Sequence, residues 1–66
     1  MLSINTVFNA IDKLGREYKY LYIRQGIYNQ NEFRLYNITL GEYTEVEEEW
    51  FNQREIEILD KVFSIR

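Results

Sequence analysis

The chain has 66 residues, a net charge of −3 and no Cys, His or Pro. This length allows one small domain, residues 1–66, and the missing residue types exclude disulfides, thiolate or imidazole metal ligands, and Ser-His or Cys-His nucleophiles. Hydrophobic residues make up 45% and charged residues 29%, which is typical of a globular protein and not of a disordered one. We therefore expect a small α+β domain that binds another macromolecule.

Residues 4–15 carry apolar side chains at the spacing of an amphipathic helix. The apolar stripe begins at Ile4 and ends at Leu14. Ser3 is a candidate N-cap, and Gly15 stands where a left-handed C-cap residue is expected. The sequence therefore predicts a first helix at about 4–15.

Two runs rich in aromatic and β-branched residues, at about 18–28 and 32–40, are separated by a polar turn. Such runs on either side of a turn predict a β-hairpin. A register that keeps like side chains together pairs Leu21 with Leu40. It sorts the side chains into a first face, Leu21, Ile23, Ile27, Tyr36, Ile38 and Leu40, and a second face, Tyr20, Tyr22, Arg24, Phe33, Leu35, Asn37 and Thr39.

The last segment predicts a second helix at about 45–64. Thr44 and Glu47 have the spacing of a capping box, and apolar residues become frequent from Phe51 onward, covering roughly half of a helical wheel. A competing interpretation makes 55–59 a third strand, because Glu and Ile alternate there. The expected fold is helix–hairpin–helix (αββα), with both helices on one face of the hairpin.

With both helices on one side, the second face of the hairpin would stay open in a monomer. Exposed apolar patches of this kind mark interfaces. The sequence therefore predicts a homodimer, or a small homo-oligomeric structural or regulatory subunit that assembles through this face. The candidate contact residues are Tyr20, Tyr22, Arg24, Phe33 and Leu35.

The negative charge is concentrated in the second part of the chain. Residues 1–41 carry five basic and three acidic side chains, whereas residues 42–66 carry three basic and eight acidic ones. Closely spaced carboxylates can imitate nucleic-acid phosphates in a basic groove of another protein; the alternative is a solvated helix start, where Glu complements the helix dipole. The candidate partner-binding residues are Glu42, Tyr43, Glu45, Glu47, Glu48, Glu49 and Trp50.

The abundance of Ile, Asn, Tyr and Glu, together with the length, resembles the composition of small inhibitors that phages and mobile elements encode. Anti-CRISPR and anti-restriction proteins belong to that group. The resemblance implies a non-enzymatic protein that docks on a host nuclease, or on another nucleic-acid-binding protein, in the host cytoplasm. It is a resemblance of composition and transfers no site residue.

Other functions have less support from the residues. The chain has no Gly-rich phosphate loop and is short for a water-excluding pocket, so we expect no enzyme, cofactor or metal site. A Tyr-rich strand near Lys19, Arg24 and Arg34 is compatible with weak single-stranded nucleic-acid binding, although the acidic half would repel a nucleic-acid backbone. No apolar run of about 20 residues is present to span a membrane.

Overall fold

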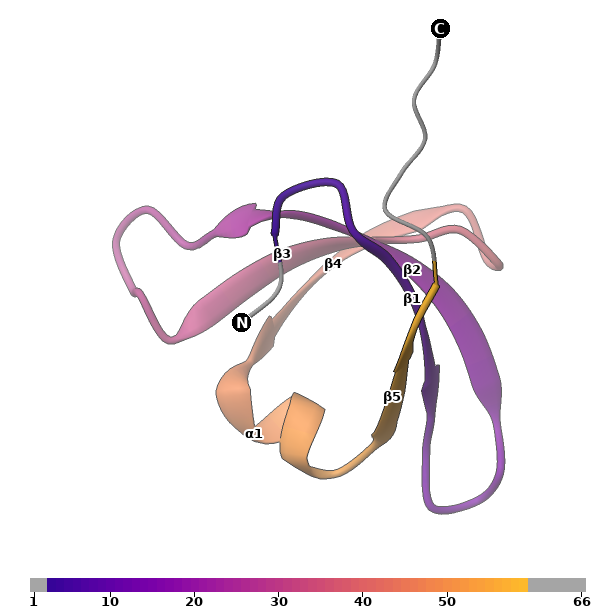
Figure 1. The fold of residues 1–66 in the computed structure, drawn as a ribbon. Helices are drawn as coiled ribbons and strands as arrows, with labels where there is room; N and C mark the ends of the chain where they lie inside the picture. The colour runs from indigo at the N-terminus through magenta and orange to yellow at the C-terminus, as the bar shows by residue number, and fades with distance from the viewer. Residues whose placement is uncertain (1–2, 60–66) are drawn as a thin grey trace, which may run out of the picture.

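The computed structural model describes residues 3–59, which form five strands and one short helix. All five strands join one antiparallel sheet in the order β4-β3-β2-β1-β5. The first four strands follow one another as hairpins, and β5 returns to the free side of β1 (Figure 1). The elements are β1 (Val7–Ile11), β2 (Glu17–Gln25), β3 (Glu32–Asn37), β4 (Glu42–Glu47), α1 (Glu48–Asn52) and β5 (Glu55–Ile58).

The sheet is strongly bent, and its concave side surrounds the core (Figure 1). The helix α1 lies at the open side of the bend, between the end of β4 and the start of β5, and contacts both strands. Its Trp50 and Phe51 rings pack against the buried core. The expected α+β class and αββα order are therefore wrong, because the described chain is a curved antiparallel sheet closed by one short helix.

The core consists of alternate side chains from the concave face. Phe8 is fully buried and packs against the rings of Tyr20, Trp50 and Phe51, with centroid distances of 5.6, 6.5 and 6.0 Å. Aromatic rings bury a large apolar area per residue, which suits a chain too short for many core positions. The buried apolar residues are Phe8, Ala10, Tyr20, Tyr22, Phe33, Leu35 and Val46.

The prediction of a first helix at about 4–15 is wrong, because Val7–Ile11 form β1 near the middle of the sheet. β1 pairs with β2 on one side and with β5 on the other. Phe8 points into the core, whereas Val7 and Ile11 lie on the convex face and are partly buried there. Apolar residues on both faces remove the strict alternation that identifies a strand, so the same residues also fit a helical stripe.

The prediction of a long second helix at about 45–64 is also wrong. Residues 45–47 belong to β4, and the helix is limited to the five residues of α1. The next segment, in which Glu and Ile alternate, is the strand β5, as the competing interpretation predicted. Residues 60–64 of the predicted helix lie outside the described residues.

The N-terminus of α1 differs from the expected capping. Glu47 is the N-cap, and it makes no side-chain cap hydrogen bond, so the capping box from Thr44 does not form. At the other end, Arg54 Nη1 donates a hydrogen bond of 3.1 Å to the carbonyl oxygen of Trp50. A side chain therefore satisfies one of the carbonyl groups that the end of a helix leaves without a partner, and the chain can leave the helix without a Gly or Pro.

The strands β2 and β3 form the expected hairpin, but their register differs from the expected one. Leu21 lies opposite Tyr36 and not opposite Leu40, and the register shifts again between Tyr22 and Arg24. Side chains an even number of residues apart on a strand share a face, and Tyr36 and Leu40 are such a pair. Leu21 therefore still shares a face with Tyr36, as predicted. The face expected to be open is instead the core, since Tyr20, Tyr22, Phe33 and Leu35 are buried.

Candidate functional site

The acidic part of the sequence forms one edge of the sheet. β4 is an outermost strand, paired with β3 alone, and α1 follows it directly. Glu48 and Glu49 continue the negative charge of β4 into the first turn of α1. We call this surface the acidic edge; its exposed carboxylates are those of Glu42, Glu45, Glu47, Glu48 and Glu49.

Most of the charge on the acidic edge has no ionic partner within the described part of the chain. Glu45 lies opposite Arg34 of β3 and its Oε2 accepts a hydrogen bond of 3.1 Å from Arg34 Nη1. Within residues 3–59, this is the one ion pair that an acidic-edge carboxylate makes. Charge along an edge strand discourages pairing with another sheet, and it also attracts a basic surface.

The acidic edge contains an exposed aromatic ring, that of Tyr43, which pairs with a partly exposed ring of β3. Tyr43 of β4 lies opposite Tyr36 of β3 with ring centroids 4.8 Å apart, and 62% of Tyr43 is exposed. The Arg34 guanidinium, which binds Glu45, lies 5.0 Å from the centroid of the Tyr43 ring. Cross-strand and cation–π contacts hold this ring in place at the surface, so a partner that binds it has less side-chain entropy to remove.

The aromatic pair is one end of an apolar row across the convex face. The register sets Val7 opposite Leu21, Leu21 opposite Tyr36, and Tyr36 opposite Tyr43, on four neighbouring strands. The first three of these side chains are partly exposed. The helix α1 lies on the concave side of the sheet and does not cover this row (Figure 1). The acidic edge therefore borders an apolar surface.

Trp50, predicted as a partner-binding residue, packs against the core. Its ring lies edge-on to the rings of Tyr20 and Phe51, with centroid distances of 5.1 and 5.0 Å. The Arg54 guanidinium lies 4.3 Å from the centroid of the same ring. Trp50 therefore fixes α1 to the sheet, and the exposed aromatic ring of the acidic edge is that of Tyr43.

The predicted oligomer face is part of the chain's own core. Burial raises the pKa values of the Tyr20 and Tyr22 hydroxyls, and Phe33 and Leu35 are also buried. Arg24, the fifth residue of that set, lies opposite Arg34, beyond the shift in register. Assembly through this face is therefore wrong for the folded chain, and a homodimer through another surface stays a prediction.

A cavity that the sequence analysis missed brings together residues from two distant segments. The turn between β1 and β2 and the segment between α1 and β5 line a surface cavity of about 300 Å³ that is largely open to solvent. The helical interpretation of residues 4–15 concealed the turn, although Asp12 and Gly15 are typical turn residues. The lining residues are Asp12, Lys13, Leu14, Arg16, Gln53 and Arg54.

Asp12 is the acidic side chain that lines this cavity, so its ionisation affects the net charge of the cavity. A hydrogen bond from the backbone N–H of Arg16 is the main cause that lowers the pKa of the Asp12 carboxyl, and the Arg16 and Leu14 donors add to it. Asp12 is therefore a carboxylate at neutral pH. The side chains of Lys13, Arg16 and Arg54 are cationic, so the cavity is positively charged overall.

Within residues 3–59, no group of three or more His, Cys, Asp or Glu side chains is placed to hold a metal ion. The helix in the described residues is too short and too polar to cross a membrane. Comparison with protein-family models, curated proteins and solved structures finds no match for this chain. The acidic edge with its aromatic pair and the basic cavity are the two candidate binding surfaces of the described residues.

Proposed function

We propose that the protein is a non-enzymatic interaction module that docks its acidic edge on a basic surface of a nucleic-acid-binding protein. The observation that carries the proposal is the exposed ring of Tyr43, which packs on Tyr36 and has carboxylates near it along β4. Protein interfaces typically centre on aromatic anchors surrounded by polar residues. The partner surface that fits this pattern is an apolar pocket bordered by Lys and Arg.

The spacing of the charge also favours such a partner. Glu45 and Glu47 are two residues apart on one strand, so their side chains share a face and are separated by about 7 Å. Pairing of β4 with β3 along its whole length holds this spacing. A groove that binds nucleic acid is built to neutralise a line of negative charges on an extended backbone, and an extended acidic strand presents a similar line.

A basic partner fits the acidic edge better than a second copy of the chain does. Residues 42–49 contain no Lys or Arg, so two acidic edges facing each other would bring like charges together, which opposes association. In this proposal the protein is an inhibitor of the anti-CRISPR or anti-restriction type. It acts in the host cytoplasm and competes with nucleic acid for a host nuclease or a related protein.

The test compares two carboxylate pairs on opposite edges of the sheet. Glu45→Gln with Glu47→Gln neutralises part of the acidic edge, and Glu55→Gln with Glu57→Gln removes the same charge from β5. Each variant is assayed for displacing labelled duplex DNA from a panel of purified nucleases and DNA-binding proteins of the host. We expect the first pair to weaken displacement about tenfold and the β5 pair to leave it unchanged.

A second matched pair tests the aromatic anchor. Tyr43→Ala removes the exposed ring from the acidic edge, whereas Tyr28→Ala removes a tyrosine that is 99% exposed and lies between β2 and β3. We expect Tyr43→Ala alone to weaken displacement, by about fivefold or more, and added salt to weaken it in the unmodified protein.

Two results would contradict the proposal. One is an equal effect of the two carboxylate pairs, and the other is the absence of displacement from every member of the panel. The charge would then serve to protect the edge of the sheet. That role has its own signature, because Glu45→Gln with Glu47→Gln would promote aggregation of the folded protein.

A further inference from the structure

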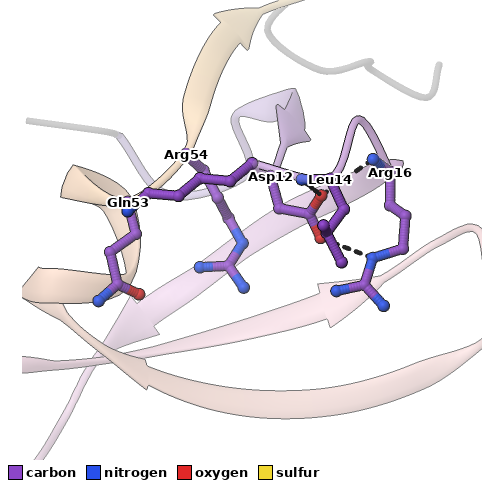
Figure 2. Close-up of a pocket in the computed structure, with 6 residues that line it drawn as sticks. Asp12, Leu14, Arg16, Gln53 and Arg54 are labelled. Carbon is purple, nitrogen blue, oxygen red and sulfur yellow. Dashed lines mark hydrogen bonds and ion pairs between the residues drawn. The ribbon is translucent and has the colours of Figure 1, made fainter.

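The turn between β1 and β2 is organised by one carboxylate. Asp12 Oδ1 accepts hydrogen bonds of 2.9 Å from the backbone N–H groups of Leu14 and Arg16, and Asp12 Oδ2 accepts one of 2.8 Å from Arg16 Nε. Gly15 has a positive φ of 84°, and its N–H donates to the carbonyl oxygen of Asp12. The Arg16 guanidinium is therefore held by its Nε, while its terminal nitrogens extend beyond the carboxylate (Figure 2).

Arg54 is held in place on the other wall of the cavity. Its guanidinium lies 4.3 Å from the centroid of the Trp50 ring, and its Nη1 donates a hydrogen bond to the Trp50 carbonyl oxygen. Figure 2 shows Arg16 and Arg54 reaching in from separate segments with the Asp12 carboxylate between them. A guanidinium has more N–H donors than these contacts use, so both arginines retain donors for a ligand.

The charge of the cavity is opposite to that of the whole protein. Three cationic side chains, those of Lys13, Arg16 and Arg54, and one carboxylate, that of Asp12, line it and leave two net positive charges. The chain as a whole carries −3. Both carboxylate oxygens of Asp12 already accept hydrogen bonds within the turn. A ligand with two negative charges would balance the remaining cations.

We propose that this cavity binds a phosphoryl group in the form of a phosphate monoester. The net charge of the cavity matches a dianion. Arginine guanidinium groups donate paired hydrogen bonds to phosphate oxygens, and lysine is also a common phosphate-binding side chain. The volume of about 300 Å³ is at the lower end of the range for ligand pockets. Leu14, which also lines the cavity and is 77% exposed, supplies an apolar contact for the organic part of the ligand.

The single tryptophan of the chain provides the measurement, because Arg54 stacks on Trp50. The protein is titrated at low salt with inorganic phosphate, with a phosphoserine peptide and with ribose 5-phosphate, and with sodium chloride at matched ionic strength. We expect a saturable change in Trp50 fluorescence with the phosphate compounds and none with chloride. Tighter binding of the peptide would identify a phosphorylated side chain as the ligand, and tighter binding of ribose 5-phosphate a sugar phosphate.

A charge-matched control separates a built site from diffuse attraction. Lys13→Gln with Arg16→Gln removes two cations of the cavity and leaves the Arg54–Trp50 contact in place, whereas Lys19→Gln with Arg24→Gln makes the same change in charge outside the cavity. We expect the first variant to bind phosphate about tenfold more weakly and the second to bind as the unmodified protein does.

Backbone amide shifts of residues 12–16 give a second measurement that does not depend on fluorescence. Saturable shifts in this turn on addition of phosphate support the proposal. Equal weakening in the two double variants, or no saturable response by either measurement, would overturn it. The proposed docking of the acidic edge is tested with other residues and another assay, so the two proposals fail independently.

Discussion

The two faces of the sheet contain similar residues and lie in opposite environments. Tyr22 and Leu35 pair across β2 and β3 on the concave face and are buried, whereas Leu21 and Tyr36 pair on the same two strands on the convex face and are partly exposed. The direction in which the sheet bends makes the difference, because α1 and its rings close the concave side (Figure 1). Alternation along a strand therefore defines which side chains share a face, and the bend of the sheet decides which face becomes the core.

Polar residues are also buried on the concave face and exposed on the convex face. Thr6 and Asn37 are buried with the core, and Asn37 Oδ1 accepts a hydrogen bond of 2.9 Å from the backbone N–H of Leu40. Among the described residues, no buried side-chain nitrogen or oxygen lacks a hydrogen-bond partner. On the convex face, by contrast, Arg34 and Glu45 form an ion pair at the surface. The concave face is thus a satisfied interior, and the convex face has the mixed character of a surface.

The two faces should differ most in the free energy of unfolding that is lost when an aromatic ring is removed. Phe8→Ala deletes a fully buried ring that contacts three others, so it should lower the free energy of unfolding by about 3–5 kcal/mol. Tyr36→Ala removes a convex-face ring whose aromatic contact is with Tyr43, and it should cost about 1 kcal/mol. Urea denaturation followed by circular dichroism measures both values.

A loss of stability as large for Tyr36→Ala as for Phe8→Ala would contradict the comparison, since it would mean that the convex face is covered in solution. Sedimentation of the unmodified protein separates the causes. A dimer would identify a second copy as the cover, and a monomer would require a segment of the chain itself. If Phe8→Ala does not fold, Phe8→Leu keeps the test, because it removes less of the buried ring and should cost more than Tyr36→Phe.

A smaller effect is expected from ionisation of the concave tyrosines. Burial raises the pKa values of Tyr20 and Tyr22 above their ordinary 10.0. The unfolded chain therefore loses these protons at lower pH than the folded chain, and the stability they contribute is complete below pH 10.0 and falls as the pH rises through the folded pKa values. Alkaline denaturation should become shallower in Tyr20→Phe with Tyr22→Phe, and it should be unchanged in Tyr28→Phe, which alters a tyrosine outside the core. An unchanged profile in the double variant would contradict the assignment.

The hairpin was predictable because its signal is local. Aromatic and β-branched residues flank a polar turn, and the alternation from Tyr20 to Tyr22 gives the two faces up to the shift in register before Arg24. The strand β5, expected only as the competing interpretation, pairs with β1, which is distant in the sequence. The strand β1 was missed although it forms a local hairpin with β2. The short apolar segments of β1 and β5 fit helical spacing as well as strand spacing. The pairing of β1 with β2 on one side and with β5 on the other decides between them.

The candidate sites were predictable to different degrees. A run of Glu residues around Tyr43 is visible in the sequence, and these residues do form one continuous edge. The exposure of Tyr43 and the burial of Trp50 depend on strand alternation and on the docking of α1, so they could not be read from composition. The basic cavity joins Arg16 to Arg54, which are far apart in the chain. Its only local sign was a turn containing Gly15, and the predicted helix obscured it.

The smallest effect concerns the ion pair at the acidic edge, and a double-mutant cycle of Arg34→Gln and Glu45→Gln measures it. The two side chains are 34% and 50% exposed, so their coupling should be about 0.2–1 kcal/mol and should fall as salt is added. Arg34 also lies over Tyr43, so Arg34→Gln should cost more than Glu45→Gln, and the excess should vanish when both are measured in Tyr43→Ala. A coupling of several kcal/mol would mean that the pair is desolvated. The convex face would then be covered in solution, and the contrast with the concave face would no longer hold.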